Sequence, residues 1–83
     1  PTTIDESGIF ARTTCYNGDK ITIGYSNDFL MTGTGERISE DVDQEVAMNV
    51  IQLLGGEEFS DRNELIEFVV SMIQIQPAPA PAP

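Results

Sequence analysis

The stretch from residue 60 to residue 75, SDRNELIEFVVSMIQI, constrains the fold of this chain more than any other. Plotted at about 3.6 residues per turn, its apolar side chains cover more than half of the helix circumference and leave a narrow polar strip. The apolar positions are Leu65, Ile66, Phe68, Val69, Val70, Met72, Ile73 and Ile75, and the polar strip is Glu64, Glu67, Ser71 and Gln74. One partner surface cannot cover so wide a face. We therefore expect the chain to pack around this helix, with a second helix on one side and a sheet on the other.

Two β-prone runs flank Asn17-Gly18 within residues 9–25, which is typical of a β-hairpin. A two-residue turn sets Ile21 and Ile23 opposite Thr14 and Arg12, whereas a three-residue Asn17-Gly18-Asp19 loop with a left-handed glycine sets them opposite Cys15 and Thr13. We favour the second register because it gathers the apolar residues on one face. The inner face then carries Ile9, Ala11, Thr13, Cys15, Ile21, Ile23 and Tyr25, and the outer face carries Phe10, Arg12, Thr14, Tyr16, Lys20 and Thr22. Ser26-Asn27-Asp28 predicts a turn into a third strand over residues 29–32.

A further helix is predicted before the pair Gly55-Gly56, because glycine is the typical residue at a helix C-terminus. We expect Ser39 to be its N-cap, followed by acidic residues that interact favourably with the helix dipole. Its apolar stripe consists of Val42, Val46, Ala47, Val50, Ile51, Leu53 and Leu54. Ser60 is the expected N-cap of the last helix. The short loop between the two helices predicts that they run antiparallel.

These elements predict an α+β fold. A small antiparallel β-hairpin or three-stranded meander is followed by an antiparallel helical hairpin packed on one sheet face. We expect residues 1–8 to form a polar N-terminal arm and residues 9–76 to form a single domain. Residues 77–83 read PAPAPAP, and alternating proline excludes a helix and favours an extended polyproline II tail.

Motifs that carry chemistry are weak in this chain, and we expect no enzyme activity and no cofactor. The sequence has no histidine, which removes the usual general base, the common nucleophile pairs and nearly every zinc site. The acidic run Glu40, Asp41, Asp43, Glu45 lacks the glycine and the closing glutamate of a calcium loop, so we expect no metal site there.

Two further features have simple structural interpretations. The segment Gly33-Thr34-Gly35-Glu36-Arg37 lacks the residues of a dinucleotide or phosphate-binding loop, and we interpret it as a flexible connector. Cys15 lies on the predicted inner face near no histidine, so we expect a buried, unreactive thiol.

Charge is the strongest functional signal. The chain has 14 acidic and 4 basic residues, a net charge of −10, and ten of the acids lie between residues 36 and 67, where the only basic residues are Arg37 and Arg62. Such a surface repels phosphates and anionic lipids, so we expect neither direct nucleic-acid binding nor membrane insertion. With no long apolar run and a single cysteine, we expect a soluble protein of a reducing compartment such as the cytoplasm.

Two surfaces are candidates for binding a partner. The first is the outer sheet face, where Phe10 and Tyr16 are predicted to project beside Arg12. The second, which we call the acidic ridge, consists of Glu57, Glu58, Glu64 and Glu67.

The expected function is that of a non-enzymatic, acidic protein-binding module, an accessory subunit or inhibitor that docks on a larger protein or assembly through its acidic ridge, its edge strand or its Pro-Ala tail. Its partner is expected to present a basic surface. The alternative is a nucleic-acid mimic of the kind that phages encode, in which carboxylates spaced like phosphates block a DNA- or RNA-binding protein. The sequence does not predict an oligomeric state.

Overall fold

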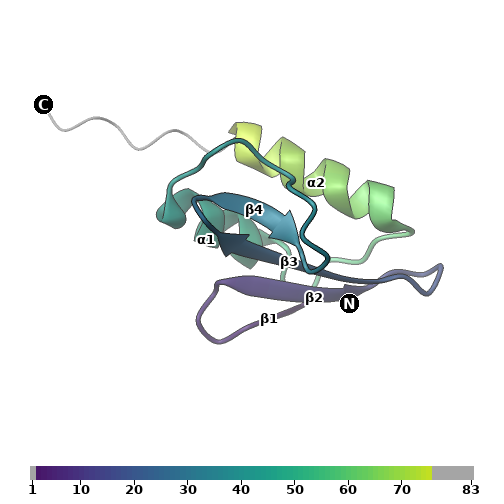
Figure 1. Cartoon of the computed structure of the whole chain (residues 1–83). Helices are drawn as coiled ribbons and strands as arrows, with labels where there is room; N and C mark the ends of the chain where they lie inside the picture. The colour runs from purple at the N-terminus through teal and green to yellow at the C-terminus, as the bar shows by residue number, and fades with distance from the viewer. Residues whose placement is uncertain (1, 76–83) are drawn as a thin grey trace, which may run out of the picture.

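The computed structural model describes residues 2–75 of the 83-residue chain. Four antiparallel strands form one sheet in the order β1-β2-β3-β4, and two helices follow and pack on it (Figure 1). The elements are β1 Thr2–Ile4, β2 Phe10–Thr14, β3 Lys20–Ser26, β4 Phe29–Thr32, α1 Gln44–Leu53 and α2 Arg62–Ile75. The predicted α+β class, with a helical hairpin after an antiparallel sheet, is confirmed. The predicted tail over residues 77–83 lies outside the described residues.

The N-terminal segment is part of the sheet and not a separate arm. β1 pairs with β2 through Thr2↔Thr13, Thr3↔Arg12 and Ile4↔Ala11. Thr2 is buried, its hydroxyl lies 2.9 Å from the Thr13 hydroxyl, and it also donates to the Glu57 carbonyl at 2.8 Å. This strand was not predicted because its residues are mostly polar. Threonine is nevertheless compatible with a strand, because its hydroxyl can form hydrogen bonds across the sheet.

The β2–β3 hairpin has the predicted loop length but a different register. Its three loop residues are 16–18: the Cys15 N–H donates to the Asp19 carbonyl at 2.8 Å, and the Gly18 N–H donates to the Cys15 carbonyl at 2.9 Å. Ile21 therefore lies opposite Thr13 and not opposite Cys15. Gly18, at φ +94°, is the last loop residue, which is where a three-residue hairpin loop requires the left-handed conformation. The shift is two residues, so the residues within β2 and β3 keep their predicted faces.

The link from β4 to α1 is held by hydrogen bonds and is not a loose connector. The Gly35 N–H donates to the Thr32 carbonyl at 2.9 Å and so closes a turn. The backbone of Arg37 forms an isolated antiparallel β-bridge with that of Met31. Ser39, the predicted N-cap, is instead buried against β4, where its Oγ accepts from the Leu30 N–H at 2.9 Å. The helix begins later, with Asp43 as its N-cap. Asp43 shares the short polar side chain that made Ser39 a plausible cap.

Capping of the second helix also differs from the prediction by one residue. The Glu64 N–H donates to Asp61 Oδ1 at 2.9 Å, so Asp61 is the residue that caps α2. The Ser60 N–H in turn donates to Glu64 Oε2 at 2.7 Å, in the manner of a capping box moved by one position. Gly56 has φ +79° in the link that follows α1, as expected for a glycine at this position.

α1, and not the long C-terminal helix, lies at the centre of the molecule. It contacts β2, β3 and α2, and it buries Val46, Ala47, Val50 and Ile51. α2 buries only Leu65 and Val69. Its other apolar residues are mostly half-buried, because a domain this small has too few elements to cover a wide apolar face. The core is completed by Ala11, Cys15, Ile23, Leu30, Leu54 and Phe59.

Candidate protein-binding surfaces

The outer sheet face brings together two of the predicted contact residues. Phe10 and Arg12 alternate along β2 with the buried Ala11 and Thr13 and so lie on the other face of the sheet, and the Arg12 guanidinium carbon lies 5.0 Å from the centre of the Phe10 ring. This is a cation–π contact, which restrains an otherwise long and mobile side chain. The pair gives the face a fixed positive charge beside an aromatic ring.

Tyr16 does not belong to this face. It lies in the β2–β3 loop, where 72% of its surface is exposed, and its hydroxyl donates to Glu58 Oε2. The hydrogen bond to that carboxylate is the main reason why the pKa of Tyr16 is raised. The loop backbone is also tied to the α1–α2 link, through Tyr16 N–H to the Phe59 carbonyl at 3.0 Å and Asn17 N–H to the Ser60 carbonyl at 3.1 Å. Tyr16 therefore lies beside the acidic ridge, in contact with Glu58.

The acidic ridge spans two structural contexts. Glu57 and Glu58 lie in the link between the helices, Glu57 beside β1 and Glu58 beside Tyr16. Glu64 and Glu67 lie on the exposed strip of α2. All four are exposed, and within residues 2–75 none of them forms a salt bridge. The ridge is thus a set of uncompensated negative charges on ordered elements.

Two of the four basic residues already form salt bridges within the domain. Arg37 pairs with Asp41 at 2.9 Å, donates to the Ser39 carbonyl at 2.7 Å and lies 4.4 Å from the centre of the Phe29 ring. Arg62 pairs with Glu36. Arg12 and Lys20 are the basic side chains outside salt bridges in the described part of the chain, and both lie on the outer face. The two unpaired cations therefore lie on a different surface from the four glutamates of the acidic ridge.

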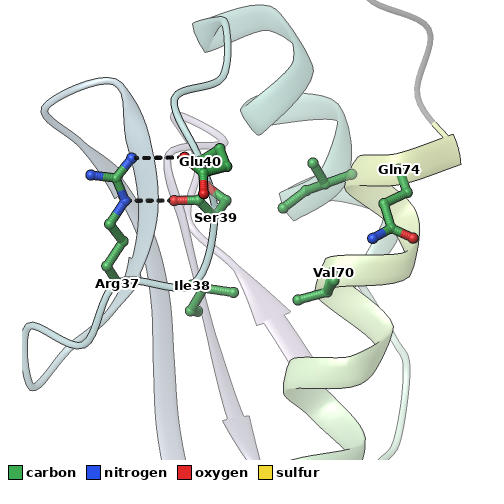
Figure 2. Close-up of a pocket in the computed structure, with 7 residues that line it drawn as sticks. Arg37, Ile38, Ser39, Glu40, Val70 and Gln74 are labelled. Carbon is green, nitrogen blue, oxygen red and sulfur yellow. Dashed lines mark hydrogen bonds and ion pairs between the residues drawn. The ribbon is translucent and has the colours of Figure 1, made fainter.

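A groove separates the 37–40 segment from the C-terminal half of α2 (Figure 2). Its volume is about 420 Å³, and Ile38 and Val70 face each other across it. Arg37 turns away from the groove toward Ser39 and Glu40. Its lining combines the apolar Ile38, Val70 and Ile73 with the polar or charged Arg37, Ser39, Glu40 and Gln74.

The sequence offers two further features as possible sites of chemistry, the single cysteine and the metal-binding residue types. Cys15 is 3% exposed, and burial, reinforced by the carboxylates of Asp19, Asp61 and Glu64, raises the pKa of its thiol. A raised pKa favours the protonated thiol over the nucleophilic thiolate, and the predicted burial of Cys15 is confirmed. Over residues 2–75 no group of three or more histidine, cysteine or acidic side chains is arranged to hold a metal ion.

Sequence reasoning missed part of the outer face. Met31 lies on it opposite Gly24, and Phe29 lies on it opposite Ser26. The signal was available in the alternation of the third predicted strand, which places Phe29 and Met31 on the same side. A glycine at the centre of a strand, Gly24, was the other unused signal.

Comparison with known proteins adds no identity: the chain matches no protein-family model, no curated protein and no solved structure. Neither helix within residues 2–75 has the length and apolar character needed to cross a membrane.

Proposed function

We propose that this chain is a non-enzymatic protein-binding module whose acidic ridge docks on a basic surface of a larger protein or assembly. One observation carries the proposal. Glu57, Glu58, Glu64 and Glu67 are exposed and outside the salt bridges of the described residues, although basic side chains are present in the same domain. Charges left uncompensated in this way steer a complementary partner toward the surface and select against acidic ones.

Local order supports the same proposal. Glu58 is held by the Tyr16 hydroxyl, and Glu64 is held by the Ser60 N–H at 2.7 Å. A side chain that is already restrained loses less conformational entropy when it binds. The module would act as an accessory subunit or an inhibitor, because what it brings to the complex is charge and shape.

The experiment is a pulldown from native lysate at low and high salt. A variant with all four ridge glutamates changed to glutamine should lose the partner while keeping the fold. The matched control removes the same number of exposed carboxylates elsewhere, through Glu6→Gln, Asp19→Asn, Glu40→Gln and Glu45→Gln. Retention of the partner by the ridge variant, or equal loss in the control, contradicts the proposal.

The same experiment addresses the alternative of a nucleic-acid mimic. A captured nucleic-acid-binding protein that is released by DNA or RNA and lost steeply with rising salt favours mimicry. A complex that survives salt and fails only in a variant ending at Gln76 identifies the Pro-Ala tail as the anchor instead.

A further inference from the structure

We propose that the outer sheet face is a second docking surface, which binds an extended segment of a partner protein carrying an apolar side chain and, two residues away, a carboxylate. This surface is distinct from the acidic ridge and has the opposite charge. The helices leave it uncovered, since they pack on the other face of the sheet (Figure 1). The inference does not depend on the function proposed for the ridge.

The first observation is a glycine that the fold itself does not require. Gly24 lies in the middle of β3, paired with Phe10 on one side and Met31 on the other. It does not have a positive φ, and an added Cβ would meet Phe10 Cβ at 3.5 Å and the Ile9 carbonyl oxygen at 3.9 Å, which are ordinary contacts. Glycine within a strand weakens it and often marks a close approach by a ligand or another backbone. Gly24 therefore indicates that something is accommodated above it.

The space above Gly24 is a shallow apolar hollow of about 300 Å³. Phe10 and Met31 line it from the neighbouring strands, and Thr22 and Gly33 line it along the direction of the strands. Its lining includes no charged side chain. An apolar side chain of a partner suits this hollow, because it would remove from water the part of the Phe10 ring and the Met31 thioether that the sheet leaves accessible.

A second hollow adjoins the first and shares Thr22 with it. Its volume is about 330 Å³, and it is lined by Arg12 and Lys20 with the threonines Thr3, Thr13, Thr14 and Thr22 and with Ile21. These two cations are the ones outside salt bridges in residues 2–75, and no carboxylate lines the hollow. The nearby Asp5 accepts hydrogen bonds from the N–H and hydroxyl of Ser7 and forms no ion pair with Arg12.

The chemistry of the occupant follows from the two hollows together. A guanidinium, an ammonium group and threonine hydroxyls supply hydrogen-bond donors suited to a carboxylate. Side chains on one face of an extended segment recur every second residue, about 7 Å apart. An apolar residue followed two positions later by Asp or Glu therefore reaches both hollows when the segment lies along the strands. A basic segment is disfavoured because Arg12 and Lys20 repel it.

The test is a selection of short random peptides, displayed on phage, against the full chain. The wild-type protein should enrich peptides with an apolar residue two positions from Asp or Glu. Affinity of the enriched peptide, measured by fluorescence anisotropy, should fall about tenfold or more in Gly24→Val, which fills the apolar hollow, and in Arg12→Gln. Arg62→Gln removes the same charge outside these hollows and should leave the affinity unchanged. Far-UV circular dichroism establishes that each variant is folded, and the exposed Arg12→Gln keeps the test valid if Gly24→Val is not.

Four outcomes overturn the inference. If no acidic peptide is enriched, or if both Gly24→Val and Arg12→Gln bind as well as wild type, the face is not a docking surface for such a segment. Self-association in analytical ultracentrifugation that Gly24→Val abolishes assigns the face to a second copy of the chain. Enrichment of basic peptides alone supports the acidic ridge and rejects this second surface, so the two proposals fail separately.

Discussion

Truncation of Leu65 tests how α2 is attached to the domain. Leu65 is fully buried in the core, so Leu65→Ala removes apolar contacts and leaves a cavity. Such changes cost about 2.7–5.0 kcal/mol, and full burial places this one near about 3–4 kcal/mol. A chain of this length has a total stability of roughly 4–12 kcal/mol, so the loss is a large fraction of it.

The assay is urea unfolding followed by circular dichroism, with the denaturant slope compared between variants. An unchanged slope shows that the difference in midpoint reports stability and not a change in the denatured state. Leu53→Ala is the matched control: it makes the same change in a helix at a side chain that is 44% exposed, and it should cost less than about 1 kcal/mol. A cost below about 1 kcal/mol for Leu65→Ala, or equal costs for the two variants, refutes the packing described for α2.

Three other outcomes are expected. Asp61→Ala removes the acceptor of the Glu64 N–H and should cost about 1 kcal/mol in the same unfolding assay, whereas Asp61→Ser should restore most of it. Glu58→Gln should bring the pKa of Tyr16 back toward its ordinary value in a spectrophotometric titration. Because the pKa of Tyr16 is raised in the folded state, the contribution of this contact to stability is present below the unfolded-state pKa and is lost as the pH rises through the folded-state pKa. Cys15 should react with a thiol reagent far more slowly in the folded than in the urea-unfolded chain, and equal rates contradict its burial.

The two-residue repeat of apolar side chains in the strands and the positions of the glycines explain why much of the fold was predictable. The alternation in β2 and β3 assigned Ala11, Thr13 and Ile23 to the buried face, because a strand has a period of two whatever its register. Gly55-Gly56 similarly marked the end of α1, because few other residues adopt a left-handed conformation at low cost.

The errors arose where several neighbouring residues were suitable helix caps, or where contacts between segments distant in sequence determined the structure. Ser39 and Ser60 are good capping residues, but Asp43 and Asp61 cap the helices, and Ser39 is needed by β4. β1 escaped notice because its pairing depends on a strand far along the chain and not on its own composition. Tertiary contacts likewise decided that α1 and not α2 is central, since apolar composition alone does not show which elements a helix will contact.

The candidate surfaces were predictable in composition but not in grouping. Phe10 and Arg12 are together as expected, because alternate residues of one strand share a face. Tyr16 joined Glu58 because the β2–β3 loop is hydrogen-bonded to the link between the helices, a contact between segments distant in sequence. The separation of Arg12 and Lys20 from the four ridge glutamates also emerged only from the folded arrangement.

The most direct measurement of the central claim is chemical-shift mapping. The isotopically labelled chain is titrated with the purified partner recovered in the pulldown, and amide shifts are followed residue by residue. We predict that the largest changes lie in residues 57–67 and at the Tyr16 loop, and that they diminish when the four ridge glutamates are replaced by glutamine. Changes confined to other parts of the chain, with the ridge unaffected, contradict the claim that this module docks through its acidic ridge.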